Sequence, residues 1–395
     1  MKKIYLDHAA ATPMRPEAIK AMLSYFENGY GNASSFHSVG KAAKDAMTMA
    51  REAIAKILNC RIMEIIFTSG GTESDNLALL GAARANRDKG RHVIVSAIEH
   101  PAVLEACKKL EKEGFEINYL PVDKEGIVKL DELARALRKD TILVSVMYAN
   151  NEIGTIQPIK EIAKIIRDKR QETRDKGGVP AIPYFHTDAC QAAGALDLDV
   201  VKLGVDMLTF SGSKIYGPKG IGVLYTKKGI RVEPLIFGGG QERGLRSGTE
   251  NIPAIVGLAV ALELAQKERG KEDQRLAGLR DYFIEGILKS IKGSRLNGSA
   301  ARRLPNNINV YIPKVEGEAM VLYLDSKGIY ASTGSACHST SLRPSHVLLA
   351  IGMRPEQVHG SLRFTLGKAT GKDDINYALK VLPGIVKKLS EISSL

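Results

Sequence analysis

The run Asp206-Met-Leu-Thr-Phe-Ser-Gly-Ser-Lys214 decides the fold class of this chain. Its first five residues are mostly apolar and β-favouring, which is typical of a buried strand. Ser211, Gly212 and Ser213 then end the strand and place Lys214 just beyond its carboxyl end. In open sheets of parallel strands, ligands bind outside these carboxyl ends. The run therefore predicts an α/β sheet with a candidate ligand site at Lys214.

Other strand-like runs surround this one and alternate with helical stretches. They cover residues 64–67, 92–96, 116–120, 141–147, 184–187 and 222–226. This alternation predicts one mainly parallel, seven-stranded sheet flanked by helices. The charged segment 170–183, which also contains glycine and proline, is expected to form a surface loop.

The pattern changes after Gly248. Two helical stretches at 250–268 and 272–292 lead to a strand at 306–312, a helix near 316–327, a loop of small residues at 331–341, a strand at 361–366 and a final helix. Because 395 residues exceed what one hydrophobic core usually holds, we expect this part to form a second, smaller α/β domain.

Composition and charge narrow the classes of protein. With 44% hydrophobic and 25% charged residues and a net charge of +12, the chain is of the ordinary globular kind. The longest nearly apolar run, 252–265, is too short to cross a bilayer of about 30 Å, and the first residues lack the apolar stretch of a signal peptide. The four cysteines show no paired spacing, which favours a reducing cytoplasm. The basic segment 169–176 has no aromatic side chains, so direct nucleic-acid binding is not expected.

Three further strand ends carry polar residues. After the strand at 64–67, a glycine turn with Gly71 and Thr72 enters a helix, whose free N–H groups can hold a phosphate; a plain turn capped by Thr72 is the alternative. His100 follows the next strand, where a histidine can also be a structural cap. Asn151 follows the strand at 141–147, where an amide can simply satisfy a turn.

Asp188 follows the strand that precedes Lys214 in the chain, and Gln191 comes three residues later. A carboxylate at the end of an apolar strand is costly to bury unless a cation pairs with it. A pyridinium nitrogen would be such a cation, and a helix N-cap is the alternative role. A desolvated lysine has a depressed pKa that favours its nucleophilic neutral form, so Lys214 could form an imine with an aldehyde. Asp188 followed by Lys214 on successive strand ends fits pyridoxal phosphate (PLP).

Three features of the second half also suggest chemistry. The glycine-rich basic loop around Thr249 either completes a phosphate site or acts as a hinge between domains. Cys337 lies among small polar residues, which favours an accessible thiol over an inert buried one. A metal site of Cys337, His338 and His346 matches no zinc spacing, so no resident metal is expected. Arg363 is a charge within an apolar strand and needs an anionic partner such as a substrate carboxylate.

Taken in order, these segments resemble the cysteine desulfurases of the IscS/NifS type, which are fold type I PLP enzymes of the class V aminotransferase-like group. The resemblance covers nearly the whole chain, with motifs at residues 5–13, 31–40 and 359–367. It implies a large PLP-binding domain of residues 15–255. Residues 1–14 and 256–395 would then form the small domain that carries the cysteine loop.

The resemblance also implies roles for single residues. Lys214 would form the internal aldimine, Asp188 would pair with the pyridine nitrogen, and His100 would stack on the cofactor and act as an acid or base. Gln191 and Asn151 would contact the cofactor's phenolic oxygen and the substrate. The implied phosphate cup consists of Gly71, Thr72, Ser211, Ser213 and, from a second subunit, Thr249.

The implied reaction removes sulfur from L-cysteine. Arg363 would hold the substrate carboxylate, Lys214 would move the α-proton, and the Cys337 thiolate would attack the substrate sulfur, leaving L-alanine and a persulfide. The resemblance further implies a homodimer that delivers sulfur to an iron–sulfur scaffold protein of the IscU type or to tRNA-thiolation partners. Cys337 could also serve as a transient cluster ligand.

One departure and two other functions remain open at this point. Ser213 stands where the family usually has histidine, which puts the affinity for the cofactor in question. A selenocysteine lyase or another PLP lyase would not need Cys337. A non-catalytic adaptor of the same fold would bind a scaffold protein through its basic surface.

Overall fold

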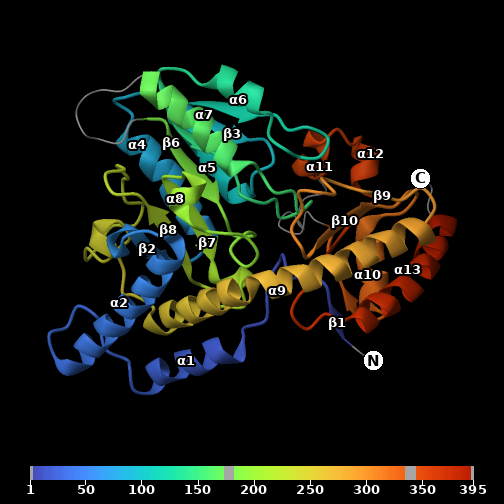
Figure 1. Ribbon diagram of the computed structural model, residues 1–395, viewed down its shortest axis with the longest axis horizontal. Helices are drawn as coiled ribbons and strands as arrows, with labels where there is room; N and C mark the ends of the chain where they lie inside the picture. The colour runs from blue at the N-terminus through green and yellow to red at the C-terminus, as the bar shows by residue number, and fades with distance from the viewer. Residues whose placement is uncertain (1–2, 173–181, 334–343, 393–395) are drawn as a thin grey trace.

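The computed structural model describes residues 3–172, 182–333 and 344–392, and its central layer is a seven-stranded sheet (Figure 1). In spatial order the strands are β2 (Ile65–Thr68), β8 (Gly222–Thr226), β7 (Met207–Ser211), β6 (Tyr184–Asp188), β5 (Thr141–Ser145), β3 (His92–Ser96) and β4 (Glu116–Leu120). Only β8 runs antiparallel to its neighbours in this sheet. The predicted α/β class and the mainly parallel seven-stranded sheet are confirmed.

Both faces of the sheet are buried, and the pleat divides each strand between two hydrophobic cores. In β3, for example, Ile94 belongs to one core while Val93 and Val95 belong to the other. This division follows from the two-residue period of a strand. Strands buried on both faces are apolar throughout, which is why the sequence reads as short continuous apolar runs rather than alternating ones.

Helices cover the two faces. They are α1 (Pro16–Glu27), α2 (Ser38–Leu58), α3 (Gly71–Asn76), α4 (Ala82–Ala85), α5 (Pro101–Lys112), α6 (Leu130–Ala136), α7 (Ile159–Glu172) and α8 (Val200–Leu203). A π-helical turn, Leu77–Gly81, joins α3 to α4. Because α7 continues to Glu172, the start of the predicted 170–183 loop is helical, and residues 173–181 lie outside the described part of the chain.

The C-terminal part builds a separate core. It contains a three-stranded antiparallel sheet, the two-stranded pair of β1 and β11, and four helices besides α9. The elements are β1 (Ile4–Tyr5), β9 (Arg295–Leu296), β10 (Asn307–Tyr311), α10 (Gly317–Asp325), β11 (Ile329–Tyr330), α11 (His346–Ala350), α12 (Pro355–Val358), β12 (Ser361–Thr365) and α13 (Lys372–Ile392). Ile4 and Leu6 pack in this core with residues from Leu276 onward. The division into residues 15–255 and residues 1–14 with 256–395 stays a prediction, because Val347, Leu348 and Val358 of α11 and α12 pack in a core of the central sheet instead.

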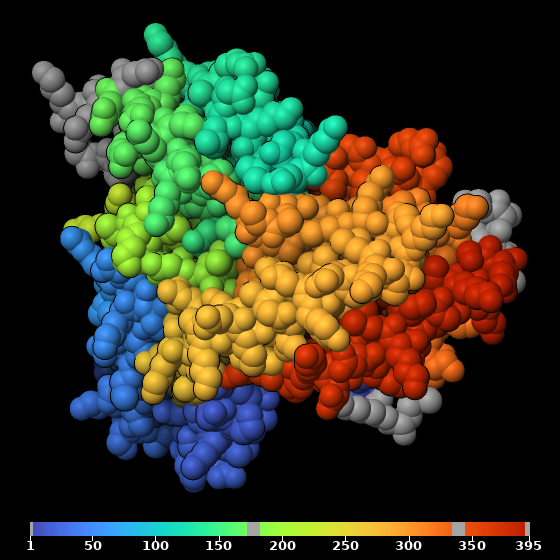
Figure 2. Space-filling model, turned by 45° about the vertical axis from the view of Figure 1, so that its right-hand side comes forward, coloured from blue at the N-terminus to red at the C-terminus, as the bar shows by residue number. Residues whose placement is uncertain are grey.

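One long helix, α9 (Ile252–Ser290), replaces the two helices expected at 250–268 and 272–292. It packs against α1 and α2 at one end and against α13 and β10 at the other. In Figure 2 it crosses the molecule between the blue N-terminal helices and the red C-terminal helix. Gly270 does not end the helix, because strong helix formers flank it on both sides. Among the described residues, no helix is both long and apolar enough to cross a lipid bilayer.

Continuity of α9 can be tested at two glycines. A Cβ atom at Gly270 would meet nothing within 4 Å, so Gly270→Ala should raise the free energy of unfolding by about 0.5–1 kcal/mol through its effect on the unfolded chain. A Cβ atom at Gly286 would lie 2.5 Å from Leu379 Cδ1, so the control Gly286→Ala should destabilise the protein. Urea denaturation of both variants measures this. A loss of stability in Gly270→Ala would show that the helix is interrupted there.

Candidate active site

A cavity of about 520 Å³ opens at the carboxyl ends of the central strands. Among the described residues, its lining contains every predicted site residue except Thr249, namely Gly71, Thr72, His100, Asn151, Asp188, Gln191, Ser211, Ser213, Lys214 and Arg363. Strand ends β2, β3, β6 and β7 supply most of them, and Arg363 comes from β12 of the C-terminal part. Topology thus brings together residues that are far apart in the chain.

Lys214 ends a short 3₁₀ turn, Gly212–Lys214, that follows β7. Its Nζ donates a hydrogen bond to the carbonyl of Ala10. The backbone carbonyl of Ser213 accepts from both the N–H and the hydroxyl of Thr12, at 2.9 and 3.0 Å. The turn that carries the lysine is therefore fastened to the N-terminal segment.

Small residues and hydroxyls form one corner of the cavity. Helix α3 begins at Gly71, and its N-cap is Gly70, without a side-chain cap. The alternative that Thr72 caps this helix is therefore wrong. The hydroxyls of Ser211 and Ser213 lie 3.1 Å apart and also face the cavity. Free backbone N–H groups and hydroxyls are the donors that hold a phosphate.

Gly71 leaves no room for a side chain. A Cβ atom at this position would lie 2.7 Å from the sulfur of Cys190, which packs beneath the turn. Burial raises the pKa of the Cys190 thiol well above its ordinary value. This cysteine is therefore a packing residue in the wall of the cavity rather than a reactive thiol.

Two buried carboxyl groups, Asp188 and Asp75, lie close enough in the wall of the cavity to interact electrostatically. Asp188 lines the cavity, and its Oδ1 accepts from the N–H of Cys190 at 2.8 Å within a turn; the next helix begins only at Val200, so the alternative role as a helix N-cap is wrong. Burial and the nearby Asp188 raise the pKa of Asp75, whose Oδ1 has no hydrogen-bond partner. His186, 3.6 Å from Asp75, supplies no positive charge because burial lowers its pKa to about 3. The raised pKa favours the protonated, neutral form of Asp75 beside Asp188.

His100 forms a further part of the wall, and its neighbour Glu99 is buried behind it. His100 is the N-cap of α5, where its Nδ1 accepts from the N–H of Ala102 at 3.1 Å, and it also lines the cavity. The structural cap role of this histidine is therefore confirmed, and its role at the cofactor stays a prediction. The neighbouring Glu99 is fully buried, and desolvation raises its pKa to about 8. Its Oε1 accepts from the Ser96 hydroxyl at 2.5 Å and from the N–H of Met147 at 2.7 Å.

Arg363 and Asn151 lie on the side of the C-terminal part. The guanidinium donates from Nη1 to the carbonyl of Asn151 at 3.0 Å and from Nη2 to Asp7 Oδ1 at 2.9 Å. The turn itself is satisfied by Asn150, whose Oδ1 accepts from the N–H of Glu152 at 2.8 Å. The side chain of Asn151 is therefore not needed for the turn.

The N-terminal segment is the part of the site that sequence reasoning did not find. Ala9, Ala10 and Ala11 line the cavity, and the carbonyl of Ala9 accepts from Gln191 Nε2 at 3.0 Å. The sequence signal for this part of the site was the row of three alanines after Asp7 and His8, because small residues permit close approach of the backbone. Without the tertiary structure that row had no partner to which it could be assigned.

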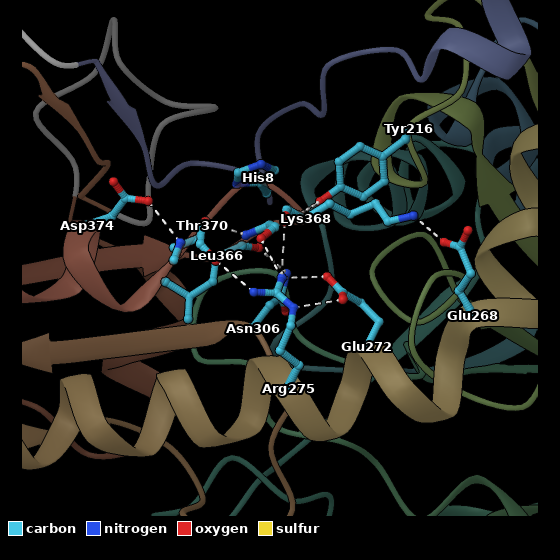
Figure 3. A network of polar contacts seen from close by, with 12 residues as sticks. His8, Tyr216, Glu268, Glu272, Arg275, Asn306, Leu366, Lys368, Thr370 and Asp374 are labelled. Carbon is cyan, nitrogen blue, oxygen red and sulfur yellow. Dashed lines mark hydrogen bonds and ion pairs between the residues drawn. The ribbon is translucent and has the colours of Figure 1, made fainter.

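A polar network fastens the segment that follows β12 to helix α9 (Figure 3). Arg275 pairs with Glu272 at 2.7 Å and donates to the carbonyls of Gly367 and Thr370. Lys368 pairs with Glu268, one turn earlier on the same helix. The segment after β12 is thereby fixed to the long helix beside a small cavity that Lys214 also lines.

Thr249 does not line the main cavity. Thr249 lines a separate cavity of about 140 Å³, which shares Ser69 and Gly220 with the main one. The loop before it is anchored by Glu242, which accepts two hydrogen bonds from Arg51 at 2.6 and 2.9 Å. Cys337 lies outside the described residues.

The sequence of this chain is similar to those of known enzymes. The model of the aminotransferase class-V family matches residues 4–378, and the chain belongs to that family. It is 52% identical to the cysteine desulfurase IscS of Methanosarcina thermophila over 394 residues, which cover 100% of this chain and 94% of the relative. The predicted resemblance to cysteine desulfurases is therefore confirmed.

Solved structures agree. A NifS-like protein is 37% identical with a TM-score of 0.90, covering 98% of this chain and 100% of the other. The structure titled SspA in complex with cysteine is 35% identical with a TM-score of 0.78, covering 92% and 99%. Both confirm the fold.

The packing of Gly71 on Cys190 generates a prediction. Gly71→Ala should lower the free energy of unfolding by about 1–3 kcal/mol, because the new methyl group and the sulfur overlap. Removing the sulfur in Gly71→Ala, Cys190→Ala should restore most of that loss, and Cys190→Ala alone is the control. The measurement is urea denaturation of the cofactor-free protein. Equal stability of the single and double variants would contradict the contact.

The raised pKa of Glu99 generates a pH prediction. Because its pKa is about 8 in the fold and 4.5 ordinarily, folding favours the protonated form, and stability from this group declines as pH rises between those values. Glu99→Gln lacks this decline. As pH rises through that range, the free energy of unfolding of the variant should therefore gain about 1.4 kcal/mol per pH unit relative to that of the wild type. Denaturation at about pH 5 and about pH 8 measures this. The exposed Glu105→Gln on α5 is the control, and a difference that does not change with pH would refute the assignment.

Proposed function

We propose that this protein is a cysteine desulfurase that uses pyridoxal phosphate to take sulfur from L-cysteine. The observation that carries the proposal is the placement of Lys214 and Asp188 at the ends of neighbouring strands, β7 and β6, in one cavity with Arg363. An amine, a carboxylate and a guanidinium around one cavity match an aldehyde cofactor with a cationic ring and an amino-acid substrate. The membership of the chain in a family with curated cysteine desulfurases supports it.

The residues present fit the cofactor. Gly71, Thr72, Ser211 and Ser213 would hold its phosphate, and the hydroxyl of Ser213 can donate where the family usually has histidine. Asp188, backed by the buried Asp75, would pair with the ring nitrogen, while His100, Gln191 and Asn151 would contact the ring and the substrate. Bound pyridoxal phosphate supplies an electron sink that weakens the bonds at the substrate's α-carbon.

The side chains of this protein would then do the rest of the chemistry. Arg363 would bind the α-carboxylate through charge-assisted hydrogen bonds. Lys214 would accept the α-proton when its amine is neutral and return it later. His100 would act as an acid or base at the reacting atoms, with Glu99 buried behind it.

Cys337 would be the acceptor of the sulfur. Its thiolate would attack the substrate sulfur, so that an S–S bond forms as the C–S bond breaks, leaving L-alanine and a persulfide. Both flanks of its segment are tied to the cavity wall. Ser332 exchanges backbone hydrogen bonds with Arg363 at 2.7 and 3.1 Å, and His346 Nε2 lies 2.9 Å from the carbonyl of Glu99.

A homodimer is part of the proposal. Large apolar side chains are exposed around α1 and α2 and on the loop before Thr249, among them Leu23, Phe26, Tyr30, Phe36, Met49 and Phe237. A contiguous exposed apolar surface usually marks an interface. Thr249 would reach the phosphate of the second subunit, because in its own chain it lines a different cavity.

The same proposal includes the sulfur acceptor and the compartment. The persulfide would pass to an iron–sulfur scaffold protein of the IscU type or to another acceptor such as a tRNA-thiolation partner. A cytoplasmic location is supported by free thiols at Cys60, Cys107 and Cys190.

Two substitutions test the function. Cys337→Ser should keep the yellow colour of the bound cofactor but lose sulfide release from L-cysteine by roughly 10³-fold or more, because the nucleophile is gone. Lys214→Ala should lose the imine bond to the cofactor, so that borohydride reduction attaches pyridoxal phosphate to the wild-type protein but not to the variant. Cys60→Ser is the matched control and should keep both properties.

Other outcomes favour other functions. Sulfide release at the wild-type rate by Cys337→Ser would indicate a lyase that does not need the thiol, and faster turnover of selenocysteine would identify its class. Wild-type protein that stays colourless after addition of pyridoxal phosphate would leave only a non-catalytic adaptor.

A further inference from the structure

The guanidinium of Arg363 is held by a carboxylate that the proposed reaction does not use. Asp7 Oδ1 accepts from Nη2 at 2.9 Å, and the carbonyl of Asn151 accepts from Nη1 at 3.0 Å. The remaining nitrogen, Nε, is buried and has no hydrogen-bond partner. Nη1 and Nη2 each carry a second hydrogen, so the guanidinium keeps N–H donors for a ligand in the cavity that Arg363 lines.

Burial makes the contact with Asp7 electrostatically important. The Arg363 side chain is only 3% exposed and that of Asp7 18%, so water screens the pair weakly. A buried guanidinium without a carboxylate is costly and tends to move toward another partner or toward solvent. Asp7 therefore supplies both a negative charge and a direction to the arginine.

Asp7 is itself fixed in place. The Tyr5 hydroxyl donates to the carbonyl of Asp7 at 3.0 Å, and the N–H of Thr365 donates to the carbonyl of Leu6 at 2.7 Å. The Thr365 hydroxyl accepts from the N–H of Ala9 at 2.9 Å. Thr365 lies on β12 two residues after Arg363, so the segment that bears Asp7 is fastened to the strand that bears the arginine.

The same N-terminal segment reaches the other half of the cavity. Its carbonyls at Ala9 and Ala10 accept from Gln191 and Lys214. A displacement of Asp7 would therefore change the geometry between the arginine and the lysine. This geometry sets where the carboxylate of an amino acid lies relative to the amine.

We propose that Asp7 is a positioning residue for recognition of the substrate's α-carboxylate, holding the Arg363 guanidinium so that its remaining N–H groups can bind the incoming group. The inference rests on the proposed function. Asp7 thereby contributes to the selectivity of the site for free amino acids over substrates whose carboxylate is blocked.

The experiment compares L-cysteine with L-cysteine methyl ester, which lacks the negative charge. Asp7→Ala should raise KM for L-cysteine roughly tenfold, equivalent to about 1.4 kcal/mol of binding, with kcat within about twofold. KM for the ester should change little. Asp7→Asn should show a smaller rise of about threefold, because its amide oxygen can still accept from Nη2.

Controls separate positioning from loss of structure. Glu17→Ala removes an exposed carboxylate that pairs with Arg15 in the same part of the chain and should leave both KM values unchanged. In an Arg363→Gln background the Asp7 effect should disappear, as expected for coupled residues. A readout other than activity is the rise in melting temperature caused by L-alanine but not by L-alaninamide, which Asp7→Ala should diminish.

The outcomes are decisive for each idea. An equal rise in KM for both substrates, or an unchanged ratio of the two KM values in either Asp7 variant, would overturn the positioning role. Asp7→Asn decides the matter if Asp7→Ala does not fold. Wild-type protein without desulfurase activity would overturn the proposed function instead, before any variant is compared.

Discussion

Burial of the central sheet on both faces is the constraint on which the rest of this structure depends. Strands such as β5, β6 and β7 have no exposed residues, so polar groups are tolerated only where they find partners or where the strands end. Asp188 and Lys214 emerge at such ends. The fold thereby concentrates chemistry at one edge of the sheet, and a cavity of about 520 Å³ lies there.

Buried carboxyl groups and a buried guanidinium lie on opposite sides of this cavity. On one side, Asp188 and Asp75 place carboxyl groups where water is excluded, and Asp75 keeps an oxygen without a partner. On the other side, the buried Arg363 is paired with Asp7 and keeps a nitrogen without a partner. Buried polar atoms without partners in one region are typical of a ligand-binding site.

The central sheet and the C-terminal part each supply charged groups to this cavity. Arg363 belongs to β12 of the C-terminal core, whereas Lys214 belongs to the turn after β7 of the central sheet. The N-terminal segment and α9 span the two, the former through Asp7 and Ala10 and the latter through Glu268 and Arg275. The placement of the C-terminal part relative to the central sheet therefore determines the distance between Arg363 and Lys214, which would hold the substrate.

The sequence by itself determined the sheet, its strand ends and most of the site, because local apolar runs and the residues that follow them are properties of neighbouring positions. Lys214, Asp188 and His100 could be found in this way. It did not determine that α9 is one helix, since Gly270 is compatible with a break or with continuity until packing decides. Nor did it show that Ala9 to Ala11 form a wall or that Asp7 holds Arg363. Those contacts join residues between 182 and 356 positions apart, and only the folded chain brings their side chains and carbonyls within hydrogen-bonding distance.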